Sequence, residues 1–307
     1  MKKKILIFGG SGLLGSNYIR SYSKKHMILA TYFNNKLKYS KSSNIKSIKL
    51  DIKMSYQKIL LKLKSFKPDY IFNFSGISDI DYCENNKREC HNVIFNGLKK
   101  IIKISKNYKA YLIHISTDSL FNNNKKFKSE NSKLVPLNYY SKLKIQCEKY
   151  LLKNYNNHLI VRTRFFGFSF KKQKNNFFEQ ILEKLKKKQI IYCYDNVFST
   201  PIGVQNLVTI LDKLSDIKLI GIFNIVSNER ISRYRFAHKV AKIFKLNEKL
   251  IMNAKYIKKK QKMKKLLDTS LSNLKIQKKL KFKIEKINES LKNLKNEKKN
   301  SSYSSSF

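Results

Sequence analysis

The chain has 307 residues, 42% of them hydrophobic, and carries 66 Lys and Arg against 20 Asp and Glu, a formal net charge of +46. This length suits one large or two modest globular domains, and no apolar run approaches the roughly 20 residues that span a bilayer. The charge suggests a nucleic-acid partner, but basic residues are spread along the whole chain and Trp is absent. We read this as compositional bias and expect no nucleic-acid or membrane partner, while local attraction of phosphate-bearing metabolites stays open.

The cysteines indicate a reducing compartment and no metal site. Cys83, Cys90, Cys147 and Cys193 include no C-x-x-C pair and no companion His at a ligand spacing. The basic start leads into a short apolar run that glycines interrupt, which is not the pattern of a secretory signal. We therefore expect a cytoplasmic protein.

The N-terminal half alternates apolar strands with amphipathic helices. This alternation predicts an α/β fold of the Rossmann type, a doubly wound parallel sheet with helices on both faces. The expected strands are 5–8, 27–32, 48–50, 70–74, 110–115 and 159–161. A helix with Ile59 and Leu63 on one face should end before Pro68, because the residue before a proline avoids the helical region.

A glycine-rich turn follows the first strand directly and runs Gly9-Gly10-Ser11-Gly12-Leu13-Leu14-Gly15. Such a turn lets backbone N–H groups approach a pyrophosphate, with the positive end of the following helix behind them. Its spacing is G-x-x-G-x-x-G. A plain strand-turn-helix joint is the alternative, but the place after an N-terminal strand favours a dinucleotide site.

The ends of the next strands carry further candidates for the same ligand. The second strand ends in Tyr32 to Lys36 without a carboxylate that would repel a 2′-phosphate, so NADP(H) is favoured and NAD(H) is the alternative. Asp51, followed by Ile52, could accept a hydrogen bond from an adenine, or simply form a turn. Ser75 and Gly76, small residues at the end of the fourth strand, would let a cofactor pass close by.

Two segments carry candidate proton chemistry. In a helix after Asn138, Tyr140 and Lys144 share a face, and a neighbouring ammonium favours the phenolate, whose free pKa is about 10. The fifth strand delivers Thr117 and Asp118 to the edge that holds the glycine turn, where a hydroxyl can donate to a carbonyl oxygen. Each pattern alone also fits a solvated Lys or a polar turn; their occurrence together favours a site.

The alternation loosens after residue 165. We expect a Rossmann domain at 1–165 and a smaller, mixed substrate-binding region at 166–295, with one strand near 221–226 returning to the sheet. Residues 177–185 and 233–244 read as helices, and 190–194 as a short strand. The basic, Ser-rich residues 296–307 are expected to form a disordered tail.

Taken in order, these segments resemble the reductase branch of the extended short-chain dehydrogenases, the family of dTDP-4-dehydrorhamnose reductase and related sugar-nucleotide-binding proteins. The resemblance runs from Ile5 to about Leu291 and rests on an ordered set of motifs. These are the glycine turn, Asp81-Tyr82-Cys83-Glu84, Ile115-Ser116-Thr117-Asp118, and Pro136-Leu137-Asn138-Tyr139-Tyr140 with Lys144 and Glu148. Epimerase relatives more often have a Ser-Ser strand end, which favours the reductase branch.

The resemblance implies a role for each matching residue. It places the pyrophosphate at Gly9, Gly12, Leu13, Leu14 and Gly15, the adenine at Asp51 and Ile52, the nicotinamide half at Ser75, Gly76, Ile115, Tyr140 and Lys144, and the sugar at Thr117, Asp118 and Phe165. Two positions depart from the family. Ile94 stands where an Asn is frequent, and Arg164-Phe165-Phe166 where a Trp often faces the substrate.

The implied function is NADPH-dependent reduction of the C4 keto group of a nucleotide-linked 4-keto-6-deoxy sugar, in deoxysugar and polysaccharide biosynthesis. Tyr140 would protonate the forming alkoxide, Lys144 would lower the pKa of Tyr140 and hold the ribose, and Thr117 would polarise the carbonyl. An NAD-dependent epimerase or dehydratase and a non-catalytic cofactor-binding subunit are the alternatives. The sequence leaves the nucleotide, the sugar and a homodimeric state open.

Overall fold

The structure is a computed structural model, and it describes residues 2–37, 44–122, 125–169, 176–257 and 266–300. Its centre is a seven-stranded sheet in the order β11-β6-β5-β4-β1-β2-β3, with every neighbouring pair parallel. The strands are β1 (Lys4–Phe8), β2 (Met27–Tyr32), β3 (Ile45–Lys49), β4 (Tyr70–Asn73), β5 (Tyr111–Ile115), β6 (His158–Arg162) and β11 (Gly221–Asn224). The predicted doubly wound parallel sheet is confirmed.

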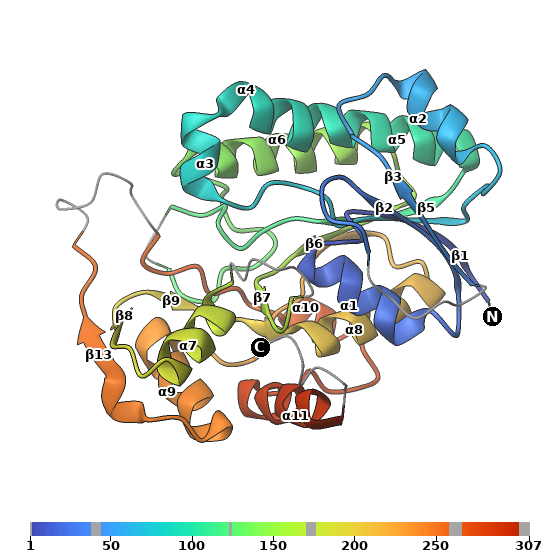
Figure 1. The fold of residues 1–307 in the computed structure, drawn as a ribbon. Helices are drawn as coiled ribbons and strands as arrows, with labels where there is room; N and C mark the ends of the chain where they lie inside the picture. Colours follow the sequence, from blue (N-terminus) through green and yellow to red (C-terminus); the bar gives the residue numbers. More distant parts are fainter. Residues whose placement is uncertain (1, 38–43, 123–124, 170–175, 258–265, 301–307) are drawn as a thin grey trace.

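Helices cover both faces of this sheet (Figure 1). One face packs on α1 (Leu13–Tyr22) and α8 (Val204–Asp216), and the other on α2 (Tyr56–Leu63), α5 (Gly97–Tyr108) and α6 (Tyr139–Asn154). Along β1 the side chains alternate: Ile5 and Ile7 join the first layer, Leu6 and Phe8 the second. Burial on both faces explains why these strands read as continuous apolar runs.

The edge strand β3 begins three residues earlier than predicted. It pairs with β2 from Ile45 to Lys49, through residues that include Lys46 and Ser47. Because an edge strand needs less apolar sequence than a central one, its first half carries too weak a hydrophobic signal to be recognised in the sequence.

Three short elements precede α5 and pack on the α6 side of the sheet: α3 (Ile80–Asn85), α4 (Lys87–Cys90) and the π-helical turn η1 (His91–Asn96). The remaining described elements form a smaller layer around three two-stranded sheets, β10–β7, β12–β9 and β13–β8. They are β7 (Phe165–Phe166), α7 (Phe177–Lys186), β8 (Ile191–Tyr194), β9 (Phe198–Ser199), β10 (Ile202–Gly203), β12 (Ile231–Ser232), α9 (Arg233–Phe244), η2 (Glu248–Leu250), β13 (Ile251–Ala254), α10 (Leu274–Gln277) and α11 (Ile287–Asn300). None of the helices in the described residues is long and apolar enough to cross a membrane.

The division into a Rossmann domain at 1–165 and a substrate-binding region at 166–295 is simpler than the arrangement in the structure. The boundary at 165 falls inside β7, which pairs with β10 rather than with the large sheet. Besides β11, helix α8 also returns to the large sheet, where it packs beside α1. The predicted tail begins too early, because α11 continues to Asn300. Residues 301–307 lie outside the described part of the chain.

A buried ionic cluster joins α8 to β1 and α1. Asp212, 1% exposed, accepts hydrogen bonds from Lys3 Nζ at 3.1 Å and Tyr18 Oη at 2.8 Å, and it lies 2.8 Å from both Lys25 Nζ and His26 Nε2. Burial favours the neutral carboxyl, but the bonds from His26, Lys25 and Tyr18 outweigh it and hold the pKa of Asp212 below its usual range.

We expect Asp212→Asn to lower the free energy of unfolding by about 3 kcal/mol at pH 7, because the substitution leaves buried Lys3 without its closest buried counter-charge. The lowered pKa makes this stabilisation present above about pH 4 and lost as the pH falls below it. The difference between the variant and the wild type in urea unfolding should therefore shrink in acid. The matched control is Asp216→Asn, whose half-exposed carboxylate also pairs with Lys3; an equal loss in both variants would contradict the cluster's role.

Candidate active site

The glycine turn lies at the point where the strand order reverses, between β1 and β4, which is where open α/β sheets bind ligands. Gly9 has φ +82°, and a Cβ atom there would lie 2.7 Å from the Ser75 nitrogen. A Cβ atom on Gly15 would lie 2.4 Å from the carbonyl oxygen of Gly9. Gly12 precedes α1 without a side-chain cap, and Leu13 and Leu14 supply the first backbone amides of the helix. The turn can therefore present main-chain amides to an anion without obstruction by side chains.

The turn after β4 is held by two buried residues that the sequence did not indicate as part of a site. Asn73 Oδ1 accepts hydrogen bonds from the Ser75 hydroxyl at 2.7 Å and the Ser75 amide at 3.2 Å. Asn73 Nδ2 lies 3.0 Å from His114 Nδ1, on the neighbouring strand β5. Gly76 has φ +151°, a conformation that favours glycine. The Asn73–His114 pair thus fixes the backbone against which a cofactor would lie.

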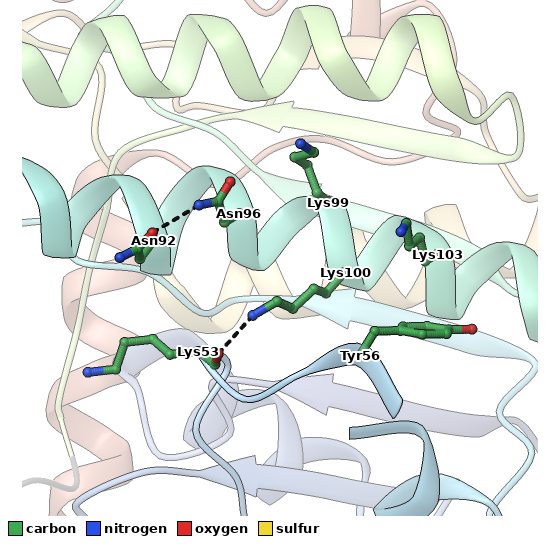
Figure 2. A pocket seen from close by; sticks show the side chains of 7 residues that line it. All are labelled: Lys53, Tyr56, Asn92, Asn96, Lys99, Lys100 and Lys103. Atoms are coloured by element: carbon green, nitrogen blue, oxygen red, sulfur yellow. Dashed lines mark hydrogen bonds between the residues drawn. The ribbon is translucent and has the colours of Figure 1, made fainter. Parts of the chain in front are cut away.

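The predicted adenine residues form a turn pinned by α5. Asp51 Oδ1 accepts a hydrogen bond from the Lys53 amide at 2.8 Å, and Ile52 packs against Gly97. Lys100 Nζ donates to the carbonyl oxygens of Ile52 and Lys53, at 2.9 and 3.0 Å. Figure 2 shows this contact beside a cavity of about 410 Å³. The cavity is lined by Lys53, Tyr56, Asn92, Asn96, Lys99, Lys100 and Lys103.

The helix that carries Tyr140 and Lys144 begins with two caps. Asn138 Oδ1 accepts a hydrogen bond from the Ser141 amide at 2.8 Å, and Glu84 Oε1 from the Tyr139 amide at 2.6 Å. Ile94, which stands where the family often has an Asn, lies in η1, and its carbonyl oxygen accepts from Cys147 Sγ of α6 at 3.6 Å. The π-helical turn therefore exists here without the Asn, and Ile94 cannot supply a side-chain amide.

Thr117, Tyr140 and Lys144 come together at the carboxyl end of β5. The Thr117 side chain lies near enough to the Tyr140 phenol to lower its pKa. Lys144 Nζ donates to the carbonyl oxygen of Ile115 at 2.6 Å, two residues before Thr117. Lys144 is 7% exposed, and burial lowers its pKa. A hydroxyl, a phenol and an ammonium therefore share one rim of the sheet, as the spacing predicted.

The expected lowering of the Tyr140 pKa does not occur. Burial raises the pKa of Tyr140 to about 12, and the nearby Thr117 side chain opposes this rise only in part. The Lys144 ammonium instead bonds to the Ile115 carbonyl oxygen. Desolvation of the phenolate thus outweighs the effect that the Tyr-x-x-x-Lys spacing suggested, and Tyr140 is a protonated phenol at neutral pH.

Asp118 does not face outward as expected for a sugar contact. It is 2% exposed, and its carboxylate binds Arg164 through Nε at 2.5 Å and Nη2 at 3.2 Å. The side chain of Arg164 is 37% exposed, so the charged group that this rim presents is a guanidinium. Phe165 follows in β7 and is half-buried. The residue that stands near the family's Trp position therefore brings a positive charge to the site.

A buried ion pair holds α6 against the sheet. Glu148 accepts bonds from Arg162 Nε at 3.1 Å and Nη2 at 2.7 Å, and from the Ser116 hydroxyl at 2.5 Å. Glu148 and Arg162 are 1% and 2% exposed. The pair joins α6 to the ends of β5 and β6, four residues beyond Lys144 and next to Thr117.

A sheet of this order, with a glycine turn at its switch point and a Tyr and Lys on α6, the helix between β5 and β6, defines a nucleotide-binding α/β protein of the short-chain dehydrogenase type. A family model described as RmlD substrate binding domain matches residues 2–300. The chain belongs to this family.

Several named proteins are similar to the chain. It is 26% identical over 204 residues to the dTDP-4-dehydrorhamnose reductase of Salmonella typhimurium, covering 66% of this chain and 64% of that protein. It is 28% identical over 203 residues to the Arabidopsis thaliana bifunctional dTDP-4-dehydrorhamnose 3,5-epimerase/dTDP-4-dehydrorhamnose reductase, covering 58% and 62%. The matches thus span about three-fifths of these relatives' length. The crystal structure of the Bacillus anthracis dTDP-4-dehydrorhamnose reductase in complex with NADP superposes with a TM-score of 0.83 at 18% identity, over 97% of this chain and all of that one.

We expect Glu148→Gln to destabilise the protein by about 3–5 kcal/mol, because it leaves the buried guanidinium of Arg162 without its counter-charge. Urea unfolding measures the loss, with Lys149→Gln on the same helix as the control. The double substitution Glu148→Leu with Arg162→Met removes both charges and should recover most of the stability. A single variant as stable as the wild type would show that the pair does not hold the helix.

Proposed function

We propose that the protein uses NADPH to reduce the C4 keto group of a nucleotide-linked 4-keto-6-deoxy sugar. The observation that carries this proposal is the meeting of Thr117, Tyr140 and Lys144 at the carboxyl end of β5, at the same sheet edge as the glycine turn. The names of the relatives, dTDP-4-dehydrorhamnose reductases, support the same reaction and substrate class.

The residues at the switch point fit a dinucleotide. The crowded backbone at Gly9 and Gly15 leaves room only for main-chain atoms, as a pyrophosphate site needs. Asp51 and Ile52 would hold the adenine, and Ser75, Gly76 and Ile115 the nicotinamide half. Lys53 Nζ lies 5.9 Å from the centre of the Phe33 ring, just after β2, so a cation lies near the strand end where a ribose 2′-phosphate would lie. This supports NADP(H) over NAD(H). When bound, the cofactor supplies the hydride.

The chain's own residues supply the proton and the polarisation. Thr117 and Tyr140 together would donate hydrogen bonds to the carbonyl oxygen, which gains negative charge as the hydride arrives. Tyr140, with a pKa raised to about 12, is protonated at neutral pH and would give its proton to the alkoxide, a far stronger base than a phenolate. Lys144, held by the Ile115 carbonyl oxygen, would position the ribose and stabilise the phenolate that forms.

A second candidate is a cofactor-binding subunit that does not turn over. It is favoured by Ile94, which lacks the amide that the family often has at that position, and by the covering of Asp118 by Arg164. Among the relatives, the Xenopus laevis methionine adenosyltransferase 2 subunit beta is 21% identical over 255 residues, covering 80% of this chain and 73% of that protein. Stoichiometric NADPH binding without reaction across a panel of sugar nucleotides would select this candidate.

We expect the protein to consume NADPH, and NADH more slowly, with a dTDP- or UDP-linked 4-keto-6-deoxy sugar. Tyr140→Phe should lower kcat by about 10²- to 10⁴-fold, because the variant cannot donate the proton. Absorbance at the reduced nicotinamide band measures the rate. Tyr139→Phe, one residue earlier on the same helix, is the control and should keep its activity. Equal rates for wild type and Tyr140→Phe would refute the assigned role.

The raised pKa of Tyr140 predicts opposite pH profiles for the two reaction directions. Reduction needs the phenol, which dominates below a pKa of about 12, so kcat should be nearly flat from about pH 6 to 9. Oxidation of the product alcohol needs the phenolate, whose fraction rises about tenfold per pH unit over this range. Stopped-flow rates at saturating substrate in both directions check this. A reduction rate that halves near pH 7 would contradict it.

A further inference from the structure

The cavity in Figure 2 lies on the α5 side of the sheet and is lined mainly by cations. Four of its seven lining residues are lysines, and its volume of about 410 Å³ suits a small-molecule ligand. The lining comes from η1 and α5 on one side, and on the other from Lys53 and Tyr56, which precede and begin α2. Thr117, Tyr140 and Lys144 do not border it, so this cavity is distinct from the proposed reacting site.

Three of the lysines have no carboxylate within 4 Å among the described residues, which hold every Asp and Glu of the chain. They are Lys99, Lys100 and Lys103, and we call them the α5 lysines. Lys53 differs, because its Nζ lies 3.9 Å from Asp51 Oδ2 and 3.8 Å from Glu89 Oε1. In a chain with 66 Lys and Arg, neighbouring lysines alone indicate only a solvated surface. The α5 lysines are distinguished by the groups that hold them.

Lys100 is fixed by main-chain oxygens. Its Nζ donates to the carbonyl oxygens of Ile52 and Lys53, at 2.9 and 3.0 Å, as the dashed line to Lys53 shows in Figure 2. These two bonds leave one of the three ammonium N–H donors for another acceptor. Burial lowers the pKa of Lys100, and the attraction of the Asp51 carboxylate opposes this only in part. An anion in the cavity would therefore meet a fixed and partly desolvated donor.

Aromatic rings hold the other two ammonium groups. Lys103 Nζ lies 5.9 Å from the centre of the Tyr56 ring, and Lys99 Nζ lies 5.7 and 5.6 Å from the centres of the Phe95 and Tyr150 rings. Such cation–π contacts attract an ammonium group but leave its charge in place. Lys99 and Lys103 are four residues apart on α5, where like charges repel each other. An anion that contacts both would offset this repulsion.

We propose that the α5 lysines bind a ligand with three linked phosphates, at a site separate from the cofactor and the sugar. Lys99 and Lys103 are spread over roughly 6 Å of helix at 1.5 Å per residue, a length that three linked phosphates can follow. Three ammonium groups then meet a group with three or more negative charges. Inorganic triphosphate and a nucleoside triphosphate share this chemistry, and the base of a nucleotide would stack on Tyr56. The inference does not depend on the proposed function.

The test is isothermal titration calorimetry of the full chain at about 0.15 M salt with saturating NADPH, using sodium triphosphate and ATP. We expect one ligand per chain. Lys99→Gln with Lys103→Gln should weaken binding by roughly 10- to 100-fold, the range for lost charge-assisted hydrogen bonds. The matched control is Lys184→Gln with Lys188→Gln, which removes the same charge from two exposed lysines four residues apart at the end of α7, on the other side of the sheet. It should alter binding by less than about twofold.

The two ligands identify the source of the triphosphate. Equal affinity for sodium triphosphate and ATP would show that the phosphate chain alone is recognised. Tighter binding of ATP, reduced to that of sodium triphosphate by Tyr56→Leu, would show that the natural ligand is a nucleotide.

Three results would overturn the inference. Equal weakening by the two double variants would show that only the net charge of the chain attracts the ligand. Competition between triphosphate and NADPH would place the anion in the cofactor site, and wild-type protein that binds neither ligand would leave the α5 lysines a solvated surface. If the double variant does not fold, Lys103→Gln at an exposed position decides, and unchanged affinity in it refutes the site. Turnover of a 4-keto sugar at the wild-type rate in Lys103→Gln would keep this site and the proposed function independently testable.

Discussion

The arrangement of the site depends on one buried carboxylate. The Glu148 carboxylate accepts hydrogen bonds from Arg162 at the end of β6 and from Ser116 at the end of β5, so α6 is held against two strands. Lys144 lies one helical turn before Glu148 and Tyr140 one turn before that, on the same face. Thr117 directly follows Ser116. The same ion pair therefore sets the distance between the hydroxyl on the strand end and the phenol on the helix.

The close packing of α6 on the strand ends also affects the pKa of Tyr140. Because α6 packs closely on the strand ends, Tyr140 loses water, and its pKa rises to about 12 instead of falling towards neutrality. The Lys144 ammonium is held at the Ile115 carbonyl oxygen, where it can meet a ribose but does not offset the loss of water around the phenol. A phenol that keeps its proton suits reduction, in which the proton leaves the protein, better than oxidation. The burial that fixes the geometry thus also suits the protonation step of the proposed reduction.

The sequence predicted those features whose causes are local. Continuous apolar runs indicated the buried strands, and the glycine turn indicated the switch point, because each signal lies within a few residues. The contacts of Asp118 with Arg164 and of Asn73 with His114 join residues 46 and 41 positions apart, so no local sequence pattern predicts them. The predicted direction of the Tyr140 pKa shift was wrong for the same reason. The spacing of Tyr140 and Lys144 in the sequence indicates that they are neighbours on a helix, whereas the burial of Tyr140 depends on the whole packed structure. The first half of β3 was missed because an edge strand tolerates polar residues.

Because acidic residues are few, the cations that they accompany can be compared with those that have no carboxylate nearby. With 20 Asp and Glu against 66 Lys and Arg, most cations have no carboxylate nearby and remain in water, where they need none. Carboxylates accompany the cations that are withdrawn from water: Asp212 at Lys3, Asp268 at Lys128 and Glu148 at Arg162. Lys144 is buried too, yet it has no carboxylate within 4 Å among the described residues, which hold every Asp and Glu. Lys144 lies at the carboxyl end of β5, where the proposed function puts the cofactor. Among the described residues the Ile115 carbonyl oxygen is the acceptor that holds this ammonium, which leaves two of its N–H donors for the ribose that the proposed function assigns to it.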